Sequence, residues 1–241
     1  MKIYSADLET TVYEGQTETE AWASAIVELH SDEPLVFKSL QDTLDYLDTQ
    51  DEDAILYYHN LKFDGNFWLS FLINDLHFKQ GYTYTSPTDV HFIDKKELQN
   101  NEVIYLISSM GQWYTITFRY HNHNYTLKDS LKLLPFKLED IGKAFGTEHQ
   151  KLSMEYEGYR YSGCEITPEE LSYIKNDVLV LKEALNIMFA DGHTRLTIGS
   201  CCLQEYKNIL GSYDWQTFFP RLDLISLDKE QYGSENADEY S

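Results

Sequence analysis

The sequence lacks features that would place it in several common classes of protein. It has no run of 18 or more apolar residues and no N-terminal basic segment followed by an apolar one, so we expect neither a transmembrane helix nor a secretory signal. Only three cysteines occur, and the adjacent Cys201 and Cys202 fit neither a disulfide framework nor a zinc-binding spacing. Walker and G-x-G-x-x-G motifs are absent. These absences favour a globular, cytoplasmic protein with no membrane partner.

Basic residues are also scarce. Lys and Arg total 19 against 40 Asp and Glu, which gives a formal net charge of −21. Such a charge repels a phosphate backbone at long range, so any nucleic-acid function must be local or bridged by metal ions. Apolar residues are plentiful by contrast. Hydrophobic residues make up 42% and aromatic residues 15% of the 241 positions, enough for one large domain with a substantial core.

The order of predicted elements indicates an α/β protein with a mixed central β-sheet flanked by helices. A capping box at Thr167, Pro168 and Glu170 marks the start of the longest helix. Residues 81–102 form a polar insertion, and residues 191–227 hold an apolar pattern without a finished unit. We expect strands at 3–9, 21–30, 35–37, 54–58, 103–108, 112–119 and 125–128, and helices at 40–47, 64–72, 138–145 and 168–190.

Two acids, Asp7 and Glu9, alternate near the end of the first predicted strand. Residues i and i+2 of a strand point to one face, so the two carboxylates project together while Tyr4, Ala6 and Leu8 face the other way. Like charges this close are either solvated at a strand end or hold a cation. The D-x-E pattern alone does not decide between these interpretations.

Two further acids fall at positions that favour a shared site. Asp64 begins a helix after a buried strand, where open α/β sheets build their sites, although alone it could simply complement the helix dipole. Asp177 lies beside a core-facing stripe, with Tyr173 one turn earlier on the same helix face, although alone it could be a surface acid. Together with Asp7 and Glu9, they form an oxygen-ligand set for two Mg²⁺ or Mn²⁺ ions. Such a pair of ions supports in-line displacement at phosphorus.

Three segments carry a resemblance to a known family. DLET at 7–10, HNLKFDGNF at 59–67 and YIKND at 173–177 resemble the Exo I, Exo II and Exo III motifs of DEDDy 3′→5′ exonucleases. In combination they look like the N-terminal exonuclease domain of protein-primed family B DNA polymerases of bacteriophages, over about residues 1–190. Further matching segments are SSMGQWY at 108–114, DSLKLLP at 129–135 and KLSM at 151–154.

The resemblance implies a ribonuclease H-like (DEDD exonuclease) fold and a proofreading activity. The protein would hydrolyse nucleotides from single-stranded DNA 3′ ends by a two-metal-ion mechanism with Mg²⁺ or Mn²⁺. The resemblance implies that Tyr173 orients the nucleophilic water, that Lys151 lies near the scissile phosphate or the metal water, and that Asp64 acts through a water or the second ion. The implied catalytic set is Asp7, Glu9, Asp64, Tyr173, Asp177 and Lys151, and its metal ligands are Asp7, Glu9, Asp64 and Asp177.

The resemblance also implies contacts with the last nucleotides of single-stranded DNA. Stacking on an aromatic ring is worth ~1–3 kcal/mol per base, so Phe63 could matter more than a surface lysine. Alternatively, Phe63 belongs to the core and Ser130 caps a helix. The implied DNA-binding residues are Thr10, His59, Asn60, Phe63, Ser130 and Leu131.

After residue 190 the sequence resembles a different part of the same polymerases. Residues 191–227 resemble the start of the polymerase palm (TIGSCCLQEYK, then SLDKE), and the later polymerase motifs are absent. We expect an exonuclease domain at 1–190, an incomplete start of the palm region at 191–227 and a disordered acidic tail at 228–241. This pattern favours an N-terminal fragment of a polymerase over a stand-alone relative. Its implied partners are a single-stranded DNA 3′ end, the missing polymerase domain and a terminal protein primer, in the host cytoplasm.

Two other functions stay open from the sequence. The charge of −21 suggests a non-catalytic interaction protein, such as an acidic DNA mimic. A mimic, however, has no reason to keep the acids and Tyr173 in this pattern. The same site could also process RNA, as an RNA-directed DEDD exonuclease.

Overall fold

The computed structural model describes residues 1–11, 16–86, 89–154 and 159–219. The chain divides into two compact units, Met1–Leu196 and Thr197–Ser241. The first unit contains an eight-stranded sheet of order β3-β2-β1-β4-β10-β9-β8-β5 and a separate two-stranded sheet, β6-β7. The strands are β1 (Lys2–Thr10), β2 (Ala21–Glu28), β3 (Leu35–Phe37), β4 (Ala54–Tyr58), β5 (Lys79–Gln80), β6 (Tyr82–Ser86), β7 (Asp89–Phe92), β8 (Glu102–Ile107), β9 (Trp113–Tyr120) and β10 (His123–Asp129).

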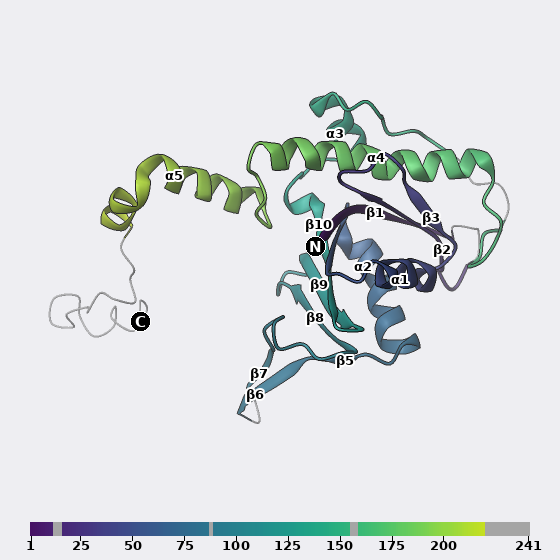
Figure 1. Ribbon diagram of the computed structural model, residues 1–241, viewed down its shortest axis with the longest axis horizontal. Helices are drawn as coiled ribbons and strands as arrows, with labels where there is room; N and C mark the ends of the chain where they lie inside the picture. The colour runs from purple at the N-terminus through teal and green to yellow at the C-terminus, as the bar shows by residue number, and fades with distance from the viewer. Residues whose placement is uncertain (12–15, 87–88, 155–158, 220–241) are drawn as a thin grey trace. The chain divides into compact units, whose positions relative to one another are not determined.

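The helices of the first unit lie between and after these strands (Figure 1). They are α1 (Leu40–Thr49), α2 (Leu61–Ser70) with a π-helical turn at Phe71–Asp75, a short 3₁₀ helix at Ser130–Lys132, α3 (Leu138–Phe145) and α4 (Pro168–Ala190). The predicted capping box of α4 is confirmed, because Thr167 Oγ1 accepts from the backbone N–H of Glu170 and the Glu170 carboxylate accepts from the backbone N–H of Thr167.

Strand β1 lies inside the sheet and sets the position of the predicted site. It pairs antiparallel with β2 and parallel with β4, and β4 in turn pairs parallel with β10. The register aligns Ala6 with Tyr58, and Tyr58 with Asp129. The carboxyl ends of β1, β4 and β10 therefore meet at one edge of the sheet, which is where open α/β sheets place their sites.

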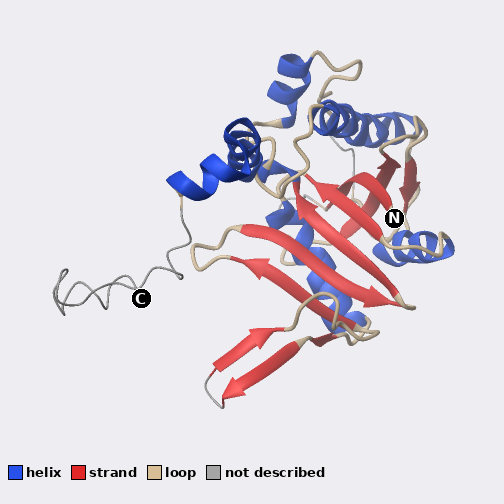
Figure 2. Cartoon of the chain, turned by 60° about the vertical axis from the view of Figure 1, so that its left-hand side comes forward, coloured by secondary structure: helices blue, strands red, loops and turns tan. Residues whose placement is uncertain are grey.

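Helices cover both faces of this sheet, as the sequence predicts (Figures 1 and 2). Tyr4, Ala6 and Leu8 of β1 are buried in a core shared with α1 and α2. On the opposite face, Ala25 and Val27 of β2 pack against Ile174 and Val178 of α4 and their neighbours. Because β1 alternates strictly, Asp7 and Glu9 project toward the face that α4 covers.

Two segments differ from the sequence prediction. Residues 81–102, expected as a polar insertion, contain the β6-β7 hairpin. Within 191–227, where no finished unit was expected, α5 (Ile198–Phe218) forms a long helix in the second unit, broken at Gly211, whose φ of 76° is left-handed. Thr197 caps this helix through the backbone N–H of Ser200. The predicted tail at 228–241, and the last residues of the predicted palm segment, lie outside the described residues.

The described helices include none that combines the length and apolar character needed to cross a membrane.

Candidate active site

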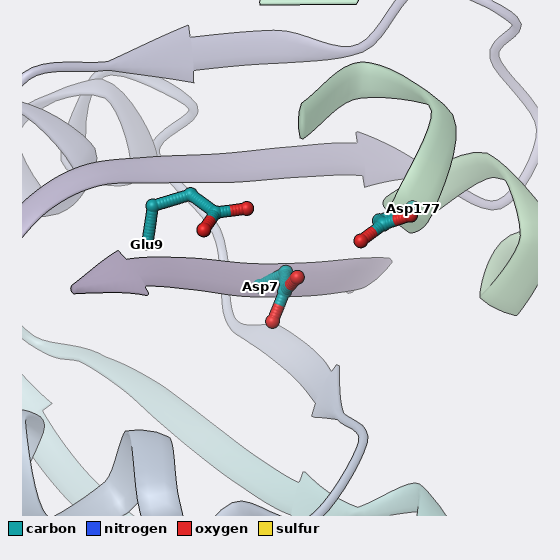
Figure 3. Close-up of side chains that lie close together, drawn as sticks. All are labelled: Asp7, Glu9 and Asp177. Carbon is teal, nitrogen blue, oxygen red and sulfur yellow. The ribbon is translucent and has the colours of Figure 1, made fainter. Parts of the chain in front are cut away.

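Three carboxylates converge where α4 crosses the end of β1. Asp7 and Glu9 come from β1 and Asp177 from α4, and Figure 3 shows them side by side. One oxygen from each lies within 4.8 Å of one from each of the others. The predicted pairing of Asp7 with Glu9 on one strand face is therefore confirmed, and α4 supplies the third acid. Such a group of oxygens suits a hard divalent cation.

Asp64 stands beside this three-acid group rather than inside it. It lies in the first turn of α2 and is only 2% exposed. The next residue, Gly65, brings this helix close to β9, because a Cβ there would come within 2.9 Å of the Trp113 ring. One carboxylate oxygen of Asp64, Oδ1, is buried with no hydrogen-bond partner among the described residues. A ligand role for Asp64 remains a prediction.

The electrostatics of the acids call for a positive partner. Burial raises the pKa of Asp64 to about 8, although hydrogen bonds from its own backbone and that of Leu8 oppose the rise. The pKa of Asp7 is also raised, first by burial and then by the charges of Asp64, Glu9 and Asp177. Burial likewise raises the pKa of Asp177, with Lys151 acting in the opposite direction. Each shift means that the folded, metal-free chain holds these charges at a cost.

A divalent cation fits this set of donors. Asp177 Oδ1, like Asp64 Oδ1, is a buried oxygen without a hydrogen-bond partner among the described residues. Carboxylate oxygens are the preferred ligands of Mg²⁺ and Mn²⁺. A bound cation would satisfy the unpartnered oxygens and offset the mutual repulsion of the acids.

Lys151 is the cation that faces the acids within the described chain. Its ammonium donates to Tyr173 Oη at 2.6 Å and forms an ion pair with Asp177 Oδ2. Burial disfavours its charge, but the hydrogen bonds to Asp177 and Tyr173 prevail, and the pKa of Lys151 is raised. Lys151 thus remains protonated beside Tyr173 and Asp177, and its role near the phosphate stays a prediction.

Tyr173 lies one turn before Asp177 on α4, so both side chains point to the same face. Its ring stands under the Lys151 ammonium, which is 4.5 Å from the ring centroid. Burial raises the pKa of Tyr173 despite the neighbouring lysine. The phenol therefore keeps its proton at neutral pH and is suited to hold a water by hydrogen bonding rather than to act as a base.

A second polar cluster joins the ends of β4 and β10. Asp129 is only 2% exposed, and its Oδ1 accepts from the backbone N–H groups of Asn60, Leu61 and Leu131 at 3.0–3.2 Å. Asn60 precedes α2 with a left-handed φ of 77°, a conformation that asparagine tolerates better than most residues. The carboxylate of Asp129 therefore fixes the turn that begins α2.

His59 is held by the same region. Its Nδ1 lies 3.0 Å from Ser130 Oγ and its Nε2 2.8 Å from the carbonyl oxygen of Phe136. Burial lowers its pKa. Ser130 is completely buried, and its hydroxyl oxygen lies 3.0 Å from the carbonyl oxygen of Tyr58. Ser130 thus orients His59 from below, and in this state its side chain has no surface with which to contact DNA; the cap of the 3₁₀ helix is Asp129 instead.

The other predicted DNA-binding residues differ in exposure. Phe63 is 47% exposed and touches Phe67 edge to face, so it is not a core residue. Thr10 is only 8% exposed. The remaining three, His59, Asn60 and Leu131, line a groove. The same groove is lined by Phe136, which is 60% exposed and which the sequence did not indicate as a binding residue. The residues lining this groove are His59, Asn60, Leu131, Pro135, Phe136, Lys137, Leu138 and Asp140. In the sequence, the Pro135-Phe136 pair that follows DSLKLL at 129–134 is the signal that could have indicated this exposed ring.

Comparison with known proteins shows what the chain is similar to. A family model described as DNA polymerase type B, organellar and viral, matches residues 47–164. The DNA polymerases of Bacillus phages Nf and phi29 are 35% and 36% identical to the chain over 235 and 237 residues, 95% of its length in each case. The chain is homologous to the N-terminal region of these type B DNA polymerases. The DNA polymerase of Streptococcus phage Cp-1 is 31% identical over 236 residues.

Solved structures of a type B polymerase agree with this assignment. Phi29 DNA polymerase in a ternary complex with primer-template DNA and incoming nucleotides has a TM-score of 0.75, at 32% identity over 96% of this chain. The same polymerase complexed with single-stranded DNA has a TM-score of 0.73 over 89% of this chain. The matched region is the N-terminal exonuclease region of these polymerases, so the predicted ribonuclease H-like fold is confirmed. The chain spans only 36–38% of the length of these relatives.

Proposed function

We propose that this chain is a metal-dependent 3′→5′ exonuclease that removes nucleotides from single-stranded DNA 3′ ends. The convergence of Asp7, Glu9 and Asp177 within 4.8 Å is the observation that carries the proposal. Lys151 and Tyr173 border the same acids, which adds a cation and a hydrogen-bonding phenol. A solvated strand end would need neither partner.

In this proposal the acids hold two Mg²⁺ or Mn²⁺ ions, with Asp7, Glu9 and Asp177 as direct ligands and Asp64 acting through a water or the second ion. Bound ions of this kind supply an activated water and neutralise charge on the phosphate. The reaction is hydrolysis: the oxygen of water bonds to phosphorus, the bond from phosphorus to the 3′ oxygen of the preceding nucleotide breaks, and that oxygen takes up a proton. The products are a nucleoside monophosphate and a shortened 3′ end.

The chain's own side chains orient the reactants. The Tyr173 hydroxyl, protonated because its pKa is raised, holds the attacking water by hydrogen bonding. The ammonium of Lys151 stands beside that hydroxyl and stabilises negative charge as it develops on the phosphate. A group placed this way acts most strongly in the transition state, where the charge is greatest.

The groove at the ends of β4 and β10 is the proposed path of the DNA strand. Exposed Phe63 and Phe136 offer ring faces for stacking, which is worth ~1–3 kcal/mol per base and does not depend on base identity. His59, Asn60 and Leu131 line the same groove. Thr10, at the end of β1, would contact the terminal nucleotide, and Ser130 would act by orienting His59.

The larger assembly is also proposed by analogy with the relatives. We infer that the chain works with a polymerase domain and a terminal protein primer during phage DNA replication in the host cytoplasm. The domain division at residues 190 and 227 belongs to this proposal. Residues 191–227 would then be the start of the polymerase palm.

A labelled-strand assay tests the proposal. A 5′-labelled single-stranded DNA is incubated with the chain and Mg²⁺ or Mn²⁺, and the products are resolved by length. We expect a ladder that shortens from the 3′ end and disappears with EDTA or in Asp7→Ala. Asp45→Ala, which removes an exposed acid on α1, is the matched control and should retain full activity. Intact DNA with wild-type protein and either metal would refute the proposal.

The same assay separates the alternatives. An acidic mimic would leave DNA intact and compete with DNA for a DNA-binding protein. An RNA-directed enzyme would shorten a matched RNA oligomer faster than the DNA one. The three-acid group gives no reason for a mimic, which would display its charges, because Asp177 is buried and Asp7 and Glu9 are half-buried.

A further inference from the structure

The segment that carries Lys151 has no regular secondary structure, yet hydrogen bonds hold it to both α3 and α4. It begins after α3 ends at Gly146, whose left-handed φ of 62° turns the chain toward α4. A lysine on an unrestrained loop would rarely hold its ammonium at one point, because the side chain has four rotatable bonds. The position of Lys151 between Tyr173 and Asp177 therefore depends on what fixes its backbone.

One fastening is to α3. The carbonyl oxygen of Gly142 accepts from the backbone N–H and hydroxyl of Thr147 and from the side-chain amide of Gln150, at 3.1–3.3 Å. The same amide donates to the carbonyl of Thr147 at 2.8 Å. Gly142 makes this approach possible, since a Cβ there would lie 3.1 Å from Gln150 Oε1. The side chain of Gln150 thus folds the loop back onto the helix before it.

The other fastening is to α4. The side-chain amide of Asn176 donates to the carbonyl oxygen of Gln150 at 2.8 Å, immediately before Lys151 in the chain. Two turns further on, Glu183 accepts from the backbone N–H of His149 at 3.2 Å and from its ring at 2.5 Å. Asn176 and Glu183 are seven residues apart and so lie on one face of α4. The helix that supplies Tyr173 and Asp177 also holds the loop that supplies Lys151.

We propose that Asn176 and Gln150 form a clamp that positions Lys151 for the hydrolysis, which makes them positioning residues rather than catalytic ones. The proposal rests on the exonuclease function proposed above. Asn176 also hydrogen-bonds to the Asp177 carboxylate through its side chain. Among the described residues, Gln150 makes no hydrogen bond to the acids, so its substitution tests the clamp separately from any effect on Asp177.

A double-mutant cycle tests whether the clamp acts through Lys151. We expect Asn176→Ala and Gln150→Ala each to lower the single-turnover rate about tenfold, since small misplacements of reacting groups cost up to 10²-fold. In the Lys151→Ala background Gln150→Ala should cost less than about twofold, because residues that act through a shared partner are not additive. If the rate loss of the double variant equals the product of the two single-variant losses, the proposal is overturned. Gln150→Ala should leave the Mg²⁺ concentration for half-maximal rate unchanged.

Asn186→Ala is the matched control. Asn186 also lies on α4 and donates its amide to a backbone carbonyl, that of Leu29, at 2.8 Å, but among the described residues it makes no hydrogen bond to the segment around Lys151. It should lose a comparable amount of thermal stability while keeping the wild-type rate. A rate loss equal to that of Asn176→Ala would mean that the clamp only supports the fold.

Chemical labelling tests the clamp without relying on activity. Metal-free protein is acetylated with a limiting reagent, and the modification of Lys151 is measured by mass spectrometry against that of Lys143, which lies on α3 and is 64% exposed. We expect Lys151 to react about threefold or more faster in Asn176→Ala and Gln150→Ala, because released segments open more often. Unchanged labelling would overturn the clamp. If wild type has no nuclease activity but labelling rises, the proposed function fails and the clamp stands.

Discussion

The buried carboxyl group of Asp64 lowers the stability of the metal-free protein. Burial raises its pKa from 3.8 to about 8, so between about pH 4 and 8 the folded state binds a proton that the unfolded state does not. Where the folded state binds more protons, stability falls as pH rises, so the metal-free protein loses stability across this window.

We therefore expect Asp64→Asn to stabilise the protein in EDTA at pH 8. The melting temperature should rise by roughly 2–4 °C for each kcal/mol recovered, and should change much less at pH 4, where Asp64 is protonated in the native state. Thermal denaturation followed by circular dichroism measures both. Asp45→Asn is the control, because that acid lies exposed on α1. An equal or lower melting temperature for Asp64→Asn at pH 8 would contradict the argument.

The Tyr173 hydroxyl supports a second prediction. Tyr173→Phe keeps the ring beneath Lys151 and removes only the oxygen that Lys151 contacts at 2.6 Å. We expect the single-turnover rate to fall roughly 10²-fold, typical for loss of a positioned proton-handling group, with the Mg²⁺ requirement unchanged. Tyr159→Phe, which changes a 55% exposed tyrosine, is the control. An unaltered rate would remove the water-positioning role.

The residues of the site were predictable to different degrees. Strand alternation placed Asp7 with Glu9, and helix periodicity placed Tyr173 with Asp177, because both rules need only nearby residues. Lys151 came from the resemblance alone. Its location depends on Gly142, Asn176 and Glu183, which no local pattern connects with it. The burial of Ser130 was equally hidden, since it follows from the pairing of β4 with β10.

At the scale of elements, the contact between α2 and β9 sets where Asp64 can lie. Gly65 faces Trp113 and Ile116 so closely that a methyl group would come within 2.9–3.0 Å of both. We expect Gly65→Ala to destabilise the fold by about 1–3 kcal/mol through overpacking, which outweighs the gain of roughly 1 kcal/mol in helix propensity. It should also slow hydrolysis by displacing the start of α2.

Chemical denaturation measures the stability change and the labelled-strand assay measures the rate. Trp113→Leu in the Gly65→Ala background provides a sharper comparison, because a smaller side chain makes room for the methyl group. Partial recovery of stability in this double variant would support steric overpacking. A Gly65→Ala protein as stable as wild type would show that the side chains of β9 can move aside without loss of folding free energy.

The elements that the sequence missed share a physical cause. In the 81–102 region, the strands of the β6-β7 hairpin are only five and four residues long, so their alternation is at the lower limit of what indicates a strand. Within α5, Gly199 and the left-handed Gly211 lower the local helix signal. By contrast the start of α4 was predicted to the residue and its end closely, because its capping box and apolar stripe agree with each other.

At the scale of the whole molecule, the site belongs to one compact unit. All the predicted catalytic residues lie within Met1–Leu196. We expect a polypeptide ending at Leu196 to fold and to hydrolyse a short single-stranded oligonucleotide at a rate within about twofold of the full chain, since compact units fold independently. The comparison is made with the labelled-strand assay and thermal denaturation. Loss of a cooperative melting transition would show that residues after 196 complete the core.

The order of contacts along the chain has a consequence for how the protein folds. Asp7 stands near the beginning of the first unit and Asp177 near its end, and the central strands β4 and β10 are also far apart in sequence. Contacts of such long range are slow to form, because a large loop must close before they bring any stabilisation. During synthesis the proposed cation site cannot form until α4 has left the ribosome and docked on β1. Metal uptake would therefore be a late event, and its rate would report the completion of folding.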